Sequence, residues 1–352
     1  MSDENTPDEF LAKLKEAFKD YQAEIPIVTH DFPDPDAIAS AMGMSEVLKL
    51  LGLKPGGIYY TGEISHPQNK SLVNLLNIFL INYEKEPFEK GLPCICVDIN
   101  DVGEGTNQPR ITSELANVKA VIDHHKGKNP SDALVDSRHS GSTSAIVWEY
   151  LKKLNFNFNN EHGEAVATSL IVGVKTDTMD LLSDNTSKLD SDAHEDLRHL
   201  VDKQTLISLI NYPLPEYFFE LRQVANLEEN KNFENSTLVA GVGIITPAKR
   251  DALPIIADEF LRMPSVQTSV IFAVIGDCVD ISVRSINISV DVGNFLKTVF
   301  GNGGGKRGAG RAKIPLGFFH MDGLDTDLQK DVWNVVKSIV LSRVMQNVKG
   351  ER

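Results

Sequence analysis

Carboxylates and imidazoles recur at four places in the first half of the chain, and together they are the side chains that bind hard divalent cations. In chain order these places are His30 with Asp34 and Asp36; Asp98; Asp123 with His124 and His125; and Asp177. Carboxylates gathered at one site repel one another by several kcal/mol at an effective dielectric constant of about 20, so cations must neutralise them. Oxygen and imidazole ligands suit Mn²⁺ best, with Mg²⁺ or Co²⁺ next. A pair of such ions polarises phosphate and activates water.

Three of the four places directly follow a short run rich in Val and Ile, at residues 25–29, 92–97 and 118–122. Such runs predict buried strands, and parallel α/β sheets carry their chemistry at the carboxyl ends of the strands. We therefore expect the acidic side chains to converge at one edge of a sheet. Taken alone, the Asp34–Asp36 turn has a plainer interpretation as a helix start with Asp36 as the N-cap.

Strand and helix patterns alternate through the first 212 residues. Helices are expected near residues 37–51, 67–79, 142–154, 164–174 and 192–200. This alternation predicts an α/β domain over 1–212 with a mainly parallel sheet flanked by helices. Pro213, Pro215 and a charged stretch indicate a linker over 213–235. The strand and helix patterns of the remaining residues, 236–352, predict a smaller α+β domain.

Composition limits the classes of function. The formal net charge of the 352 residues is −14, which argues against a general nucleic-acid coat because long-range attraction for phosphate would have the wrong sign. Three cysteines form neither a disulfide framework nor a four-ligand zinc site, which favours a reducing cytoplasm. No uninterrupted apolar stretch approaches the ~20 residues that span a bilayer, so a membrane partner is not expected.

A basic, glycine-rich segment stands out in this acidic chain. Residues 301–313 contain Lys306, Arg307, Arg311 and Lys313 and no acidic residue, and Arg284 ends a predicted strand before them. Glycine amides beside arginine side chains hold phosphate groups well, so we interpret this segment as a phosphate clamp. The alternative is a flexible basic surface loop. A dinucleotide fingerprint is rejected because helix, and not strand, is predicted immediately before the glycines.

These motifs together resemble the DHH phosphoesterase superfamily, named for the triad that occurs here as Asp123, His124 and His125. Residues 30–40, 97–100 and 173–178 resemble its first, second and fourth motifs. Ser282–Ser285 and the glycine segment resemble its associated C-terminal substrate-binding domain. The two-domain layout is similar to the oligoribonucleases that degrade nanoRNA and also dephosphorylate 3'-phosphoadenosine 5'-phosphate. The family's glycine segment usually continues with His, whereas here Lys306 follows Gly305.

The resemblance implies a role for each site residue. One ion would be held by His30, Asp34 and Asp98, and a second by Asp36, Asp98, His124 and Asp177, with Asp98 shared between them. His125 would face the substrate phosphate, and Asp123 would orient an imidazole. The implied substrate-binding residues are Arg284, Ser285, Gly303, Gly304, Gly305, Lys306 and Arg307.

The implied activity is that of a manganese-dependent phosphoesterase of the 3'-5' exoribonuclease type. Its partners would be short RNA or DNA oligonucleotides or small nucleotide phosphates, and the resemblance also suggests a homodimer. Two other enzymatic hypotheses are a cyclic dinucleotide phosphodiesterase and an exopolyphosphatase. A nucleotide-binding regulator without turnover is the alternative from a different class.

Overall fold

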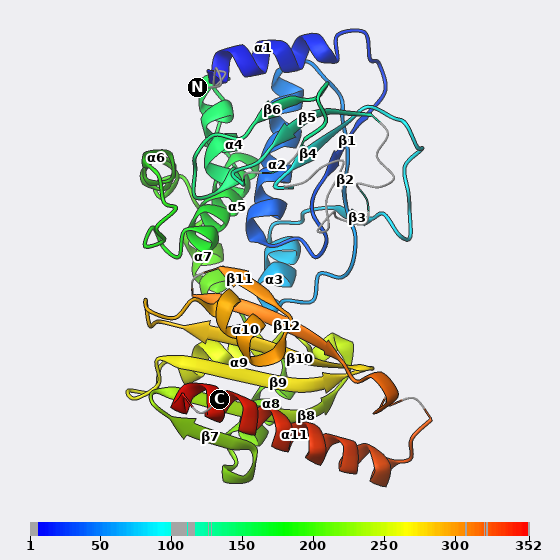
Figure 1. The fold of residues 1–352 in the computed structure, drawn as a ribbon. Coiled ribbons are helices and arrows are strands. Elements are labelled where there is room, and N and C mark those ends of the chain that lie inside the picture. The colour runs from blue at the N-terminus through cyan, green and yellow to red at the C-terminus, as the bar shows by residue number, and fades with distance from the viewer. Residues whose placement is uncertain are drawn as a thin grey trace. The chain divides into compact units, whose positions relative to one another are not determined.

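The computed structural model describes residues 6–99, 111, 117–125, 127, 129–306, 308–319, 321 and 323–350. It divides into two compact units, which we call the N-terminal unit (Met1–Pro213) and the C-terminal unit (Leu214–Arg352). Figure 1 shows the elements of each. Residues 214–235, which the sequence assigned to a linker, lie in the C-terminal unit and form a helix and a strand there.

The N-terminal unit is built on a six-stranded sheet in the order β3-β2-β1-β4-β5-β6. Its strands are β1 (Ile25–Val28), β2 (Pro55–Tyr60), β3 (Leu80–Asn82), β4 (Cys94–Val97), β5 (Val118–Ile122) and β6 (Leu134–Asp136). Every neighbouring pair is parallel, which confirms the predicted α/β fold. The chain moves outward from β1 to β3 and then from β4 to β6 on the other side. The carboxyl ends of β1 and β4 therefore form the switch point where such sheets bind ligands.

The described helices cover one face of this sheet (Figure 1), whereas the alternation of strands and helices predicts helices on both faces. The helices of the unit are α1 (Pro7–Ala17), α2 (Pro35–Leu50), α3 (Pro67–Leu75), α4 (Thr143–Lys153), α5 (Glu161–Asp177), α6 (Lys188–Leu197) and α7 (Lys203–Ile210). Ile27, Ile95 and Ile122 pack in one apolar core with α2, α4 and α5, because alternate strand residues point to the same face. The core on the other face includes Val28 and Val121.

The C-terminal unit holds a second six-stranded sheet in the order β11-β12-β10-β9-β8-β7, with β8 and β9 as its one parallel pair. Its strands are β7 (Lys231–Glu234), β8 (Thr237–Ile245), β9 (Thr268–Ile275), β10 (Cys278–Ser285), β11 (Gly304–Lys306) and β12 (Ala309–Pro315). Its helices are α8 (Glu216–Asn226), α9 (Ala252–Phe260), α10 (Val292–Phe300) and α11 (Thr326–Lys349), with short 3-10 turns η1 (Glu228–Asn230), η2 (Pro247–Lys249) and η3 (Gly317–Phe319).

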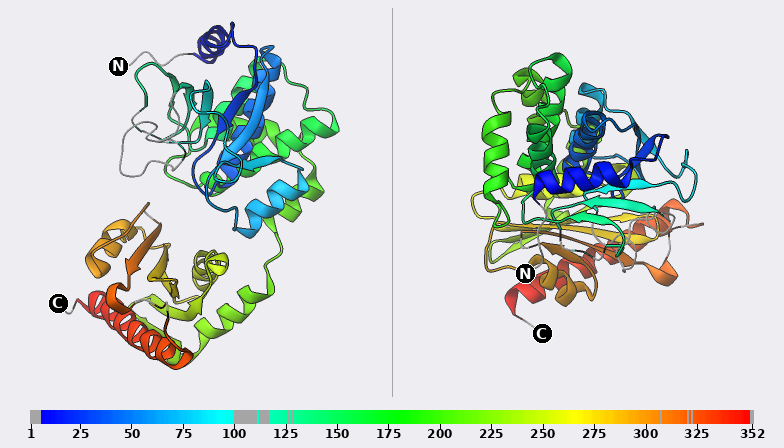
Figure 2. Two further views of the ribbon diagram at one scale, coloured as in Figure 1. Left: turned by 90° about the vertical axis from the view of Figure 1, so that its right-hand side faces the viewer. Right: turned by 90° about the horizontal axis from the view of Figure 1, so that it is seen from above.

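Two apolar layers sandwich this second sheet. Residues of α8 and α9 share one core with Leu238 and Ile271, whereas α10 and α11 share another with Val239 and Phe272. Figure 2 shows α11 running along its side of the sheet. The glycine segment is not an irregular loop, because β11 and β12 form a hairpin within it. No helix in the described parts of either unit combines the length and apolar character that crossing a bilayer requires.

Candidate metal centre

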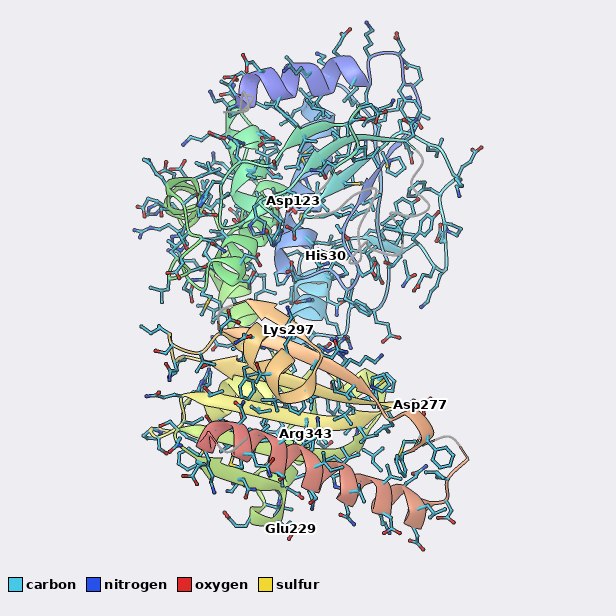
Figure 3. All side chains as sticks on the ribbon, in the orientation of Figure 1. His30, Asp123, Glu229, Asp277, Lys297 and Arg343 are labelled. Carbon is cyan, nitrogen blue, oxygen red and sulfur yellow. The ribbon has the colours of Figure 1, made fainter. Side chains whose placement is uncertain are left out.

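Three adjacent strands of the first sheet deliver acidic and imidazole side chains to one edge. His30 follows β1, Asp98 follows β4, and Asp123 begins the triad directly after β5. Figure 3 labels His30 and Asp123 in this unit. Asp98 has a φ of 54°, in the left-handed region that non-glycine residues seldom adopt, and such backbone clusters at functional sites. The predicted convergence at the strand ends is therefore present.

The turn before α2 separates the environments of Asp34 and Asp36. Asp34, and not Asp36, is the N-cap of α2, because its Oδ1 accepts hydrogen bonds from the amides of Asp36 and Ala37, each at 3.0 Å. The Asp34 side chain is 43% exposed, whereas that of Asp36 is 0% exposed. Because Asp34 caps the helix, the Asp36 carboxylate is not needed as a cap and points into the protein.

Asp36 is held by the first turn of a different helix. Its Oδ2 and Oδ1 accept hydrogen bonds from the amides of Thr143 and Ser144 at 2.7 and 2.8 Å, at the N-terminus of α4. A helix N-terminus stabilises an anion by its free amides and its dipole. Gly173 of α5 permits this approach, because a Cβ there would lie 2.2 Å from the Ser144 Oγ and 3.0 Å from the Asp36 Oδ1.

Asp177 reaches the site from a helix, as the last residue of α5, and it is the one member that follows no strand. Its Oδ2 lies 3.3 Å from the Nε2 of His124. The site is therefore formed by three strand ends, the start of α2 and the end of α5.

Each of the three imidazoles has an acceptor at its Nδ1. That atom lies 2.8 Å from the Asp31 carbonyl in His30, 3.3 Å from the Ser140 carbonyl in His124, and 3.0 Å from the Asp123 Oδ1 in His125. A proton on each Nδ1 leaves Nε2 as the free ring atom, which is how metal-binding histidines are usually oriented. The Nε2 of His124 is buried, and the Asp177 Oδ2 at 3.3 Å from it does not lie in hydrogen-bonding geometry.

The donor atoms form two groups that meet at Asp98. In one group, the Nε2 of His30 lies 3.8 Å from Asp34 and 3.6 Å from the Asp98 Oδ2. In the other, the Nε2 of His124 lies 3.9 Å from Asp36 and 3.3 Å from Asp177. The Asp98 Oδ1 lies 3.6 Å from that same Nε2, so the two carboxylate oxygens face different groups.

These sets are among the described residues whose ligand atoms lie close enough together to hold a metal ion. Oxygen and nitrogen donors without sulfur fit Mn²⁺, Mg²⁺ or Co²⁺. The partnerless Nε2 of His124 is the observation of this structure that fits a metal ligand, because an imidazole nitrogen buried without a hydrogen bond is otherwise unfavourable.

The electrostatics show how much negative charge is concentrated here. Burial, together with Asp98 and Asp177, raises the pKa of Asp36 well above its usual range. Although burial lowers the pKa of His124, the carboxylates of Asp177, Asp36 and Asp98 raise it to about 10. The surrounding carboxylates thus favour a positive charge at the position of His124, which a proton or a metal ion can supply.

Sequence reasoning missed Thr143, the first residue of α4. Its Oγ1 donates to the Asp98 Oδ1 at 2.8 Å and lies 3.3 Å from the backbone amide of His124, while its own amide binds Asp36. One residue therefore contacts three members of the site. The available signal was the run Ser140–Ser144, in which hydroxyl residues and a glycine precede an apolar helix.

The C-terminal unit has a pocket of about 480 Å³ next to the glycine hairpin. Its walls include Arg284, Gly304 and Gly305, which the family resemblance implies bind substrate, together with Ser282 of β10. Ser285 does not line it. Strand alternation puts Ser285 on the opposite face from Ser282 and Arg284, and its hydroxyl bonds Thr268 and the Gln267 carbonyl.

The remaining predicted clamp residues are placed differently. Gly303 is not part of the pocket wall; its φ is 120°, and a Cβ there would lie 2.9 Å from both the Arg311 carbonyl oxygen and the Leu296 Cβ. The Lys306 side chain and all of Arg307 lie outside the described residues. Gly303 therefore permits close packing of the hairpin against α10.

The basic segment contains no acidic residue of its own, but carboxylates distant in sequence pair with arginines of this pocket. The Arg311 Nε donates to the Asp280 Oδ1 at 2.8 Å, and the Arg250 Nε lies 3.4 Å from the Asp280 Oδ2. The Arg284 Nε lies 3.1 Å from Asp258. The cations of this pocket are already partly neutralised within the unit.

Comparison with known proteins identifies the family. Residues 24–174, which include most of the metal-centre residues, match the model of the DHH family, N-terminal domain. The N-terminal unit thus contains a domain of the DHH family. The chain is 33% identical over 332 residues to the uncharacterised protein MJ1633 of Methanocaldococcus jannaschii, a match covering 94% of this chain and 66% of that protein.

Two further DHH comparisons are informative. A probable manganese-dependent inorganic pyrophosphatase of Staphylococcus epidermidis is 27% identical over 211 residues, or 59% of this chain and 62% of that protein. The chain thus spans less than two thirds of the length of these relatives. The structure of an exopolyphosphatase-related protein from Bacteroides fragilis superposes with a TM-score of 0.65 and 16% identity, covering 95% of this chain and 98% of that one. This last likeness shows a shared fold across both units.

Proposed function

We propose that this protein is a phosphoesterase with two divalent cations, preferably Mn²⁺, that hydrolyses short oligonucleotides and small nucleotide phosphates such as 3'-phosphoadenosine 5'-phosphate. The observation that carries the proposal is that the two carboxylate oxygens of Asp98 face two separate donor groups, one with His30 and one with the buried Nε2 of His124. His30, Asp34 and Asp98 would hold one ion. Asp36, Asp98, His124 and Asp177 would hold the other.

Cations bound in this way supply Lewis acidity toward a phosphate and toward water. The chain's own residues supply orientation. Asp123 accepts from the Nδ1 of His125 and so orients the ring. The Nε2 of the imidazolium form would then donate to a phosphate oxygen in the transition state. Thr143 fixes the rotamer of Asp98 through the 2.8 Å hydrogen bond, so that both carboxylate oxygens keep their directions.

The pocket of the C-terminal unit favours a substrate that carries a nucleoside. Leu253 and Pro254 supply apolar wall, and the Arg284 guanidinium beside Gly304 and Gly305 supplies hydrogen-bond donors. A base or ribose fits the first kind of surface and a phosphate fits the second. We assign this pocket to recognition of the part of the substrate that does not react.

A second candidate is hydrolysis of inorganic pyrophosphate or polyphosphate. The match to probable manganese-dependent pyrophosphatases favours it, because that match covers 59% of the chain. A cyclic dinucleotide would also present phosphate and base to the same groups. The homodimer that the family resemblance suggests is part of the proposal, and sedimentation tests it.

The test is a panel of substrates read out by product identity under saturating Mn²⁺. The panel contains a dinucleotide, a short RNA, 3'-phosphoadenosine 5'-phosphate, a cyclic dinucleotide, pyrophosphate and polyphosphate. We expect mononucleotides from the first two substrates, and loss of that activity in Asp98→Ala. Turnover of pyrophosphate alone would favour the second candidate. Stoichiometric nucleotide binding without any turnover would identify a regulator.

A further inference from the structure

Asp190, in the first turn of α6, is a fully buried carboxylate that accepts five hydrogen bonds. Two come from the amide and the hydroxyl of Ser187, at 2.8 and 2.7 Å, and belong to the capping box of α6. The other three come from the loop before α4: the Ser140 hydroxyl at 3.1 Å, the Gly141 amide at 2.6 Å and the Ser142 hydroxyl at 2.8 Å. A helix cap does not require these three.

The loop that Asp190 holds is the one that orients two members of the metal centre. The Ser140 carbonyl accepts from the Nδ1 of His124, which sets the direction of that ring. The Ser142 hydroxyl caps α4 by accepting from the Ala145 amide at 3.3 Å, and the next amides of α4 bind Asp36. Movement of this loop would therefore turn His124 and displace the amides that hold Asp36.

The loop is also confined from its other side. A Cβ on Gly141 would lie 2.7 Å from the Thr178 Cγ2 and 3.0 Å from the Asp190 Oδ2. Thr178 directly follows Asp177, so the loop lies between Asp190 and the end of the helix that carries Asp177. Three donor residues thus depend on the position of one three-residue segment.

We propose that Asp190 is a positioning residue of the metal centre, acting through residues 140–142 on His124 and Asp36; this inference rests on the metal centre of the proposed function. A carboxylate offers about four lone-pair sites on its two oxygens, so these five donors use its full acceptor capacity. An asparagine amide would keep one oxygen and turn an NH₂ group toward donors, which leaves some of them unpaired. Residues that orient metal ligands in this indirect way typically change metal affinity by about 10- to 100-fold when replaced.

The experiment compares Asp190→Asn with Asp202→Asn in the full chain. Asp202 caps α7 by accepting from the Gln204 amide at 3.0 Å, and none of its hydrogen bonds within the described part of the chain goes to residues 140–142. Its replacement therefore controls for the loss of a helix cap. Free Mn²⁺ is followed by electron paramagnetic resonance, and Co²⁺ binding by its visible absorption. We expect Asp190→Asn to raise the Mn²⁺ Kd about tenfold and to alter the Co²⁺ spectrum, and Asp202→Asn to do neither.

Thermal melts distinguish a role of Asp190 in positioning the metal ligands from a role in fold stability alone. If Asp190→Asn lowers Tm but leaves the Mn²⁺ Kd and the Co²⁺ spectrum unchanged, Asp190 only stabilises the fold and the inference is overturned. Should that variant fail to fold, Ser140→Ala removes one of the five donors, and an unchanged Mn²⁺ Kd there overturns it equally. If the wild-type protein does not bind Mn²⁺, the proposed metal centre is refuted, and so is the role of Asp190 in positioning its ligands.

Discussion

The metal centre and the basic pocket treat charge in opposite ways. In the N-terminal unit, the described partners of Asp36, Asp98 and Asp177 are imidazoles, backbone amides and one hydroxyl, with no lysine or arginine among them. In the C-terminal unit, Arg311 and Arg284 already have carboxylate partners. The first site must recruit cations to balance its charge, whereas the second must exchange one anion for another.

This difference separates the chemistry from the recognition. Activity at a site that depends on added cations should fall steeply when a ligand shared by both ions, such as Asp98, is lost. A pocket with internal ion pairs should respond gradually, because a phosphate that binds there competes with an existing carboxylate and gains only the difference in free energy. The predictions below test this contrast, from the largest expected effect to the smallest.

Replacing the shared carboxylate should have the largest effect. Asp98→Asn removes the charge that faces both donor groups while keeping the size of the side chain, and we expect kcat to fall about a thousandfold, comparable to the loss of a transition-state stabilising group. Steady-state kinetics and Mn²⁺ stoichiometry measure it. Asp20→Asn, at an exposed position, is the control. Retention of activity within about tenfold would place the shared ligand elsewhere.

The affinity for Mn²⁺ should increase with pH. The pKa of His124 in the metal-free protein is raised to about 10, so at neutral pH the ring carries a proton that a metal ion must displace. Release of the His124 proton alone makes the affinity rise about tenfold per pH unit while the pH stays below that pKa. Although burial lowers the pKa of His30, the carboxylates of Asp34 and Asp98 raise it well above its usual value, so its proton makes the slope steeper. Titrations at several pH values measure the slope. A Kd independent of pH would contradict the protonated state, and nucleotide binding to the arginine pocket should lack this dependence.

The stability of the metal-free protein should fall as the pH rises, whereas the affinity for Mn²⁺ increases. The protonated ring of His124 contributes stability fully below its ordinary pKa of 6.5, and that contribution is lost as the pH rises through about 10. We therefore expect the Tm of the metal-free N-terminal unit to fall over this interval. Thermal melts in a chelating buffer measure it, and a Tm that rises with pH would refute the assignment.

Crowding beside Asp36 should produce an intermediate effect. Gly173→Ala places a methyl group 2.2 Å from the Ser144 Oγ and 3.0 Å from Asp36, and we expect the free energy of unfolding to fall by about 1–3 kcal/mol as α5 shifts. Mn²⁺ affinity should fall with it. Gly304→Ala in the basic pocket is the matched control, because its added methyl meets nothing within 4 Å. Equal effects of the two changes would be inconsistent with close packing at Gly173.

The basic pocket should give the smallest changes. Arg284→Ala is expected to raise KM about tenfold with kcat retained, since one charged hydrogen bond is lost in both the ground and transition states. Asp258→Asn removes the carboxylate that pairs with Arg284, so KM should fall about threefold, the size of an exposed ion pair. A change in kcat alone would show that the pocket takes part in the chemical step.

Some of this architecture follows from sequence and some does not. The strand-end positions of His30, Asp98 and Asp123 were predictable because parallel strands end at a common edge. Asp177 was a candidate, but its position at the end of α5 depends on where that helix ends. Thr143 was missed because hydroxyl residues at helix starts usually only cap the helix.

The arrangement of the C-terminal unit could not be predicted in full, for two physical reasons. Ser285 lies on the strand face opposite Arg284, because a strand reverses face at every residue and a pattern that predicts the strand does not predict which residues face a ligand. Arg311 and Asp280 are 31 positions apart in the sequence and lie on different strands, so no local sequence pattern reveals their pairing. Long-range pairing, and not secondary structure, limited the sequence interpretation.

The separate hydrophobic cores of the two units have a consequence for how the protein melts. The described core clusters lie entirely before or entirely after the boundary at Pro213. Two blocks of this kind unfold as independent cooperative steps, so calorimetry should resolve two endotherms where a single-core protein gives one. Manganese should shift only the endotherm of the block that carries His30, and a nucleotide only the other. The heat trace would then assign each ligand to its half of the chain without any measurement of catalysis.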